Sequence, residues 1–74
     1  MSYTDYLKKL FYLTELLEKE KAGTANSLAE NLGVSTRTVF RYLDELRMQG
    51  ADIEYSRNQR IYILKNDFDF KKIF

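Results

Sequence analysis

A turn of only three residues, Gly33–Ser35, joins two segments whose apolar residues recur at helical spacing, and its last residue is the candidate N-cap of the second segment. The first segment runs from Thr24 to Leu32, and the second runs from Ser35 to about Gln49. Threonine and serine favour the N-cap of a helix, and glycine favours the position just past a helix end. Because the connection is so short, the sequence predicts two helices that cross steeply and brace one another, which is the helix-turn-helix layout.

The second of these helices has two faces of different chemistry. By the 100° step of a helix, the apolar face carries Val39, Tyr42, Leu43 and Leu46. The first turns of the helix carry polar, basic and aromatic groups at a positively polarised helix end, namely Thr36, Arg37, Thr38, Phe40 and Arg41. An α-helix fits the major groove of B-DNA, where arginine can donate two hydrogen bonds to guanine. These residue types predict contact with DNA; the alternative is that both arginines are solvated surface charges.

Two acidic residues follow one turn later in the same helix, Asp44 and Glu45. Their charges would repel phosphate groups if the whole helix lay flat in the groove. We therefore expect any docking on DNA to use the N-terminal half of the helix.

A longer amphipathic segment, from about Ser2 to Lys21, precedes the pair and predicts a first helix. Its leucines recur at helical spacing, at Leu7, Leu10, Leu13 and Leu17. Phe11, Tyr12 and Leu16 widen the apolar face, which is consistent with core packing or with a dimer face. Gly23 follows this segment, and glycine is the usual residue beyond a helix end.

The period of the sequence changes from helical to alternating after Gly50. Ile53–Ser56 and Arg60–Leu64 alternate and are rich in β-branched and aromatic residues, which predicts two strands. A two-residue loop at Asn58–Gln59 would pair Tyr55 with Tyr62 and Ile53 with Leu64. All four side chains would then share one face, which we expect to be the core face, leaving Ile61 and Ile63 on the outer one.

The predicted turn between the strands carries a second basic group, Arg57, Asn58 and Arg60. A helix-turn-helix followed by a two-stranded hairpin is a winged helix. Such a tip can reach a phosphate strand or the adjacent minor groove. The alternative is that these are solvated charges at the end of a hairpin.

The stretch Leu28–Leu46 resembles the DeoR-type winged helix-turn-helix of bacterial transcription regulators. The shared pattern is L-A-x-x-L-x-V-S-x-R-T-V-x-R-x-L-x-x-L, and the resemblance covers roughly Lys8 to Leu64. It implies that Thr36, Arg37 and Phe40 face bases, and that Ser35, Thr38 and Arg41 face phosphates. Family members often carry Asp where this chain has Tyr42, and Gly where its wing has Arg60–Ile61. Most also carry a large effector or dimerisation domain, which is not among these 74 residues.

Histidine and cysteine are both absent from the chain. Their absence removes the usual general base and the usual zinc ligands, so we expect no enzyme, no metal and no cofactor. The net charge is only +1, so binding to a polyanion must come from local placement of charge. No uninterrupted apolar run exceeds four residues and no signal peptide is evident, so we expect a cytoplasmic location and no membrane partner.

Together these patterns predict an α+β fold, a three-helix winged helix-turn-helix with a C-terminal two-stranded β-hairpin wing. Residues 1–65 would form the DNA-binding domain, and residues 66–74 an aromatic tail for packing or dimerisation. The expected function is sequence-specific binding of double-stranded DNA by a homodimeric bacterial or mobile-element transcription regulator, with no small-molecule effector site. The alternative is a winged-helix adaptor that binds another protein and not DNA.

Overall fold

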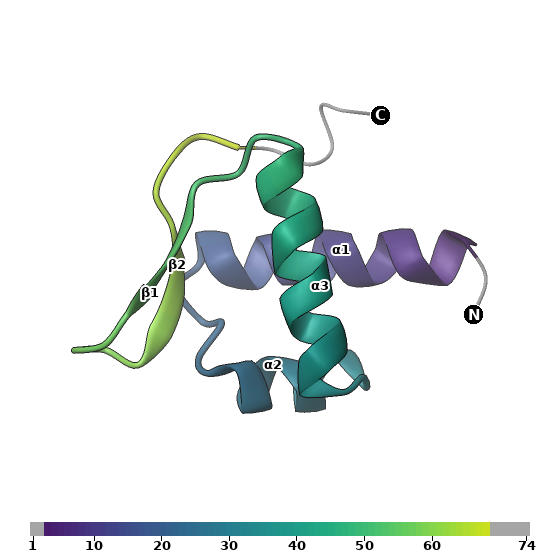
Figure 1. Cartoon of the computed structure of the whole chain (residues 1–74), viewed down its shortest axis with the longest axis horizontal. Helices are drawn as coiled ribbons and strands as arrows, with labels where there is room; N and C mark the ends of the chain where they lie inside the picture. Colours follow the sequence, from purple (N-terminus) through teal and green to yellow (C-terminus); the bar gives the residue numbers. More distant parts are fainter. Residues whose placement is uncertain (1–2, 69–74) are drawn as a thin grey trace.

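Three helices and one antiparallel hairpin make up the fold, seen in a computed structural model that describes residues 3–68 (Figure 1). The elements follow in the order α1 (Tyr3–Glu18), α2 (Ala25–Leu32), α3 (Thr36–Met48), β1 (Ile53–Ser56) and β2 (Ile61–Leu64). Helix α3 crosses α1, α2 lies at the N-terminal end of α3, and the hairpin stands beside α3. The predicted α+β winged helix-turn-helix is therefore confirmed.

Helix α1 ends earlier than its sequence pattern predicts, at Glu18 and not near Lys21. Glu20 adopts a left-handed backbone with φ of +56°, and the N–H of Lys21 reaches back to the carbonyl of Leu16 at 2.9 Å. This is the hydrogen bond of a Schellman motif, in which glycine usually occupies the left-handed position. Gly23 does not end the helix; its carbonyl instead accepts the N–H of Tyr62 at 3.2 Å.

The predicted caps of α2 and α3 are confirmed. The hydroxyl of Thr24 accepts the N–H of Ser27 at 3.2 Å, and that of Ser35 accepts the N–H of Thr38 at 3.2 Å. Gly33 has a φ of +69° just past α2, a conformation in which other residues are strained. The C-terminal end of α2 and the N-terminal end of α3, both capped by hydrogen bonds, therefore meet within a three-residue turn.

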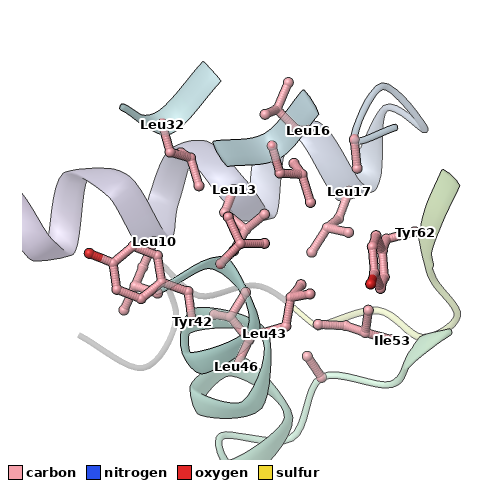
Figure 2. Packing of buried hydrophobic residues seen from close by; sticks show 14 of the residues in the cluster. Leu10, Leu13, Leu16, Leu17, Leu32, Tyr42, Leu43, Leu46, Ile53 and Tyr62 are labelled. Atoms are coloured by element: carbon pink, nitrogen blue, oxygen red, sulfur yellow. The ribbon is translucent and has the colours of Figure 1, made fainter. Parts of the chain in front are cut away.

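The core forms where the three helices and the hairpin meet (Figure 2). Its largest fully buried side chains are those of Leu10, Leu13, Leu17, Leu28, Val39, Leu43 and Leu46. Tyr42 also lies inside, with its ring 5.5 Å from that of Tyr6 in an edge-to-face arrangement. The widened face of α1 also serves the core, because Leu16 is buried and Phe11 is half-buried against it.

The hairpin has the predicted register, which pairs Ile53 with Leu64 and Tyr55 with Tyr62. The loop is longer than expected, however, because strand pairing stops at Ser56 and Ile61 and leaves a four-residue turn. Arg60 closes this turn in a left-handed conformation with φ of +57°, its N–H donating to the Ser56 carbonyl at 2.7 Å. Arg60 belongs to the turn, as predicted for the basic group of Arg57, Asn58 and Arg60; the alternating pattern that began at Arg60 becomes a strand only from Ile61.

The core face predicted for the hairpin is wrong at one position. Ile53 and Tyr62 are buried, and Leu64 packs against the core. Tyr55 is 42% exposed, because it lies near the turn, where its ring rests on that of Tyr62 at 4.9 Å. Ile61 and Ile63, expected on the outer face, are half-buried.

The start of the tail folds back on the α3–β1 connection. Asn66 donates to the carbonyl of Gly50 at 2.9 Å and accepts the N–H of Asp52 at 3.2 Å. Phe68 then packs against the core. The tail residues Phe70, Ile73 and Phe74 lie outside the described residues.

Candidate nucleic-acid interface

The N-terminal turn of α3 is fixed by its own cap. The hydroxyls of Ser35 and Thr38 lie 3.1 Å apart, and the Ser35 oxygen also accepts the Thr38 N–H. Val34 is half-buried beneath the turn. These contacts hold the first backbone N–H groups of α3 at a fixed, solvent-facing helix end, where the helix dipole favours an anion.

The outer face of α3 gathers the residues predicted to contact DNA. Thr36, Arg37 and Arg41 are exposed, and Phe40 is 49% exposed. Within residues 3–68, neither Arg37 nor Arg41 forms an ion pair. Thr38 differs from the others because it is half-buried and engaged with the cap. Two guanidinium groups therefore stand one turn apart on a rigid helix, with their donors available to a ligand.

The C-terminal half of α3 holds a charged residue that the sequence pattern did not single out, Arg47. One of its guanidinium nitrogens donates to the Asp44 carboxylate at 3.2 Å, and two others approach the Ile53 carbonyl at 3.2 and 3.4 Å. The i,i+3 spacing of Asp44 and Arg47 could have indicated the ion pair. The link to Ile53 depends on tertiary packing and left no signal in the sequence.

Asp44, whose charge we expected to repel phosphates, is partly neutralised by Arg47. Glu45 lies one helical turn after Arg41 on α3 and is half-buried near Tyr6. Burial raises the pKa of the Tyr6 hydroxyl, Glu45 raises it further, and Arg41 acts in the opposite direction. The N-terminal end of α1 thus lies close to the basic face of α3, on the flank of that face that carries Arg41.

The hairpin carries the second basic group. Arg57, Asn58 and Arg60 are all exposed in the turn, and Figure 1 shows this turn projecting from the helices on the side where α3 begins. In the described part of the chain, Arg57 and Arg60 take part in no ion pair. Arg60 has a left-handed backbone, a conformation that glycine adopts more readily than residues with a Cβ.

Comparison with known proteins places this geometry in a family. A family model described as an HTH (helix-turn-helix) domain matches residues 8–63. The chain belongs to the HTH domain family. HTH domains are of a DNA-binding, regulatory type and not of an enzymatic one. No curated protein matches this HTH domain, and no solved structure matches it.

The family match covers most of the fold and both basic groups. It begins within α1 and ends in β2, so it includes the turn between α2 and α3 as well as the hairpin tip. Arg37, Arg41, Arg57 and Arg60 all fall inside it.

The described surface outside α3 and the hairpin carries fewer candidate functional groups. A depression of about 360 Å³ lies between α1 and the end of α2, lined by Asp5, Lys8, Lys9, Tyr12, Asn31 and Leu32. None of these residues belongs to α3 or the hairpin. Over residues 3–68, acidic side chains form no cluster of three that could hold a metal ion. No helix in that range is long and apolar enough to cross a lipid bilayer.

Proposed function

We propose that this HTH domain binds double-stranded DNA in a sequence-specific manner. The N-terminal half of α3 enters the major groove, and the hairpin lies on the flanking backbone as a wing. The observation that carries the proposal is the placement of Arg37 and Arg41. Both are exposed on a capped helix without an intramolecular ion pair among the described residues, while Arg47 is engaged within the fold.

The side chains divide into two roles. Thr36, Arg37 and Phe40 face the bases, because an exposed N-terminal turn reaches the groove floor first. Ser35, Thr38 and Arg41 face phosphates, with the backbone N–H groups of the helix end beside them. The wing residues Arg57, Asn58 and Arg60 contact phosphates and carry no sequence information.

The biological setting is a transcription regulator of the DeoR type, from a bacterium or a mobile element, acting in the cytoplasm. The L-A-x-x-L to R-x-L-x-x-L pattern over Leu28–Leu46 supports this assignment. Residues 1–65 form the DNA-binding domain, and residues 66–74 form the packing or dimerisation tail. The contacts of Asn66 and Phe68 support the packing role of its first part.

The regulator acts as a homodimer in this proposal, because one recognition helix covers few base pairs and two-fold dimers read paired half-sites. Leu16 is buried and Phe11 packs against the core, which leaves Tyr12 as the exposed member of the α1 stripe. The proposed interface includes the tail aromatics, with the Phe11, Tyr12 and Leu16 stripe of α1 as the alternative. Light scattering on the whole chain and on a chain ending at Phe68 tests this: a dimer should become a monomer. A whole chain that is monomeric at tens of micromolar contradicts the dimer.

Salt dependence of duplex binding tests the DNA proposal. If each protomer neutralises about three to four phosphates, the log–log slope of affinity against salt should be near −3. A fluorescently labelled duplex titrated at several salt concentrations gives this slope. The alternative function is that of an adaptor that binds another protein and not DNA. The net charge of +1 and the exposure of Phe40 and Met48, the latter 80% exposed, support this adaptor function. It predicts no measurable duplex binding at moderate salt.

A further inference from the structure

Arg47 links the recognition helix to the wing. Its side chain leaves the last turn of α3 and donates two hydrogen bonds to the backbone carbonyl of Ile53, the first residue of β1. The remaining terminal nitrogen donates to Asp44, one turn back on α3. The guanidinium is therefore held from both sides, by its own helix and by the strand that leads to the wing tip.

The planar shape of the guanidinium makes this arrangement directional. Its five N–H groups lie in a fixed fork, so donation to a carbonyl on one edge and a carboxylate on another sets the orientation of the group. A lysine ammonium has three rotatable donors and does not fix a plane. Ile53 is buried at the base of the hairpin, so a shift at its carbonyl moves the strand as a whole.

We infer that Arg47 is a positioning residue for DNA binding: it sets the wing relative to α3 so that both basic groups meet the same duplex. This inference rests on the proposed function. The ion pair with Asp44 has a second effect, because it weakens the negative charge that would otherwise face the phosphates beside the recognition helix. The residue thus contributes to binding without touching DNA.

Other contacts keep the hairpin folded when Arg47 is changed. The Gly23 carbonyl accepts the N–H of Tyr62, Asn66 ties the α3–β1 connection to the chain after β2, and Ile53 remains in the core. None of these contacts runs from a side chain of α3 to the backbone of β1. Loss of Arg47 should therefore loosen the angle between α3 and the wing more than it lowers the stability of the domain.

A double-mutant cycle on duplex binding tests the inference, using the wild type, Arg57→Ala, Arg47→Met and the double variant. In the wild-type background, Arg57→Ala should make the salt slope shallower by about 0.9, the value for one phosphate contact. In the Arg47→Met background the same change should be less than half as large, because the wing tip no longer sits at a fixed distance from the groove. An equal change in both backgrounds would overturn the inference.

Arg47→Lys separates position from charge. This variant keeps the positive charge but not the planar fork of donors. In the Arg47→Lys background, Arg57→Ala should therefore change the salt slope by less than half of the wild-type amount, as in the Arg47→Met background. A change as large as in the wild type would overturn the positioning role. Thermal unfolding of each variant identifies any that fail to fold, and Arg47→Lys then provides the cycle in place of Arg47→Met. Lys19→Met, which removes an exposed cation paired with Glu15 on α1, is the matched control and should leave the slope unchanged.

Different results would contradict the proposed DNA-binding function and the positioning role of Arg47. Absence of salt-dependent duplex binding by the wild type removes the proposed function itself. A wild-type slope near −3 that Arg57→Ala does not alter overturns the positioning role, since the wing then has no contact to position. In that case, weaker binding by Arg37→Ala would still support the contribution of α3.

Discussion

The hydroxyl oxygen of Ser35 accepts a hydrogen bond from the backbone N–H of Thr38 at 3.2 Å, and this contact caps the helix proposed to enter DNA. The same atom lies where a phosphate is expected, at the positive end of α3. Ser35 thus has an observed structural role as a helix cap and a proposed role in binding DNA. Two substitutions at this one position separate the roles.

Ser35→Ala should lower the free energy of unfolding by about 1 kcal/mol, the usual cost of losing an N-cap. Ser35→Asp should retain most of that stability, because aspartate caps as well as serine. It should nevertheless weaken duplex binding, because the carboxylate repels a phosphate at the same place. Urea unfolding and duplex titration of both variants measure the two effects. A Ser35→Asp variant that binds as tightly as the wild type would remove Ser35 from the interface.

Glu20 and Gly33 both have a left-handed backbone, but substitutions at these two positions should change the free energy of unfolding in opposite directions. Glu20→Gly should stabilise the fold by about 0.5–1 kcal/mol, because it relieves left-handed strain that exceeds the entropic cost of glycine. Gly33→Ala should cost about 1–2 kcal/mol through backbone strain alone, since no atom lies within 4 Å of an added Cβ. Urea unfolding measures both. A destabilised Glu20→Gly variant would show that the Glu20 side chain makes a compensating contact.

Much of the fold could be predicted because local signals and tertiary structure agree. The caps Thr24 and Ser35, the face of α3 that includes Val39 and Leu43, and the pairing of Tyr55 with Tyr62 all follow from spacing and residue type. Each of these signals depends on hydrogen bonds or periodicity within a few residues. The tight turn between two such signals then leaves few ways to arrange the helices.

The remaining features depend on contacts that spacing does not reveal. Gly23 lies at the edge of the hairpin and not at a helix end, because Tyr62 needs an acceptor there. Glu20 and Arg60 adopt left-handed conformations that residue type argues against. The contact of Arg47 with Ile53 could not be predicted because the acceptor is a backbone carbonyl. Every residue has this group, so residue type gives no indication of the contact.

The wing should contribute affinity without selectivity. Replacing Arg57 and Arg60 together by alanine should make the salt slope shallower by about two units, since each phosphate contact contributes about 0.9. The affinity for selected and unselected duplexes should fall by the same factor. Replacing Lys19 and Lys21, which follow α1, is the matched control for net charge. An unchanged slope in the wing variant would mean that the hairpin points away from DNA.

Alkaline pH should destabilise the fold through Tyr62. Burial raises the pKa of its hydroxyl above the ordinary 10.0, and Tyr55 adds to this while Arg47 opposes it. The unfolded chain therefore releases this proton at a lower pH than the folded one does. The resulting stability is fully present below pH 10 and is lost as the pH rises above that value. Urea unfolding between pH 8 and pH 11 should show a smaller loss for Tyr62→Phe than for the wild type; equal losses would contradict this assignment.

The affinity of Arg37→Ala for duplex DNA tests the central claim most directly. A duplex selected from random sequence by the wild type and a scrambled duplex of equal length are titrated at one salt concentration, with Lys19→Ala as the matched control. We predict that Arg37→Ala loses about 1–3 kcal/mol on the selected duplex and much less on the scrambled one, while Lys19→Ala binds both as the wild type does. An Arg37→Ala variant that keeps the wild-type affinity and selectivity would contradict the claim that this face of α3 reads DNA.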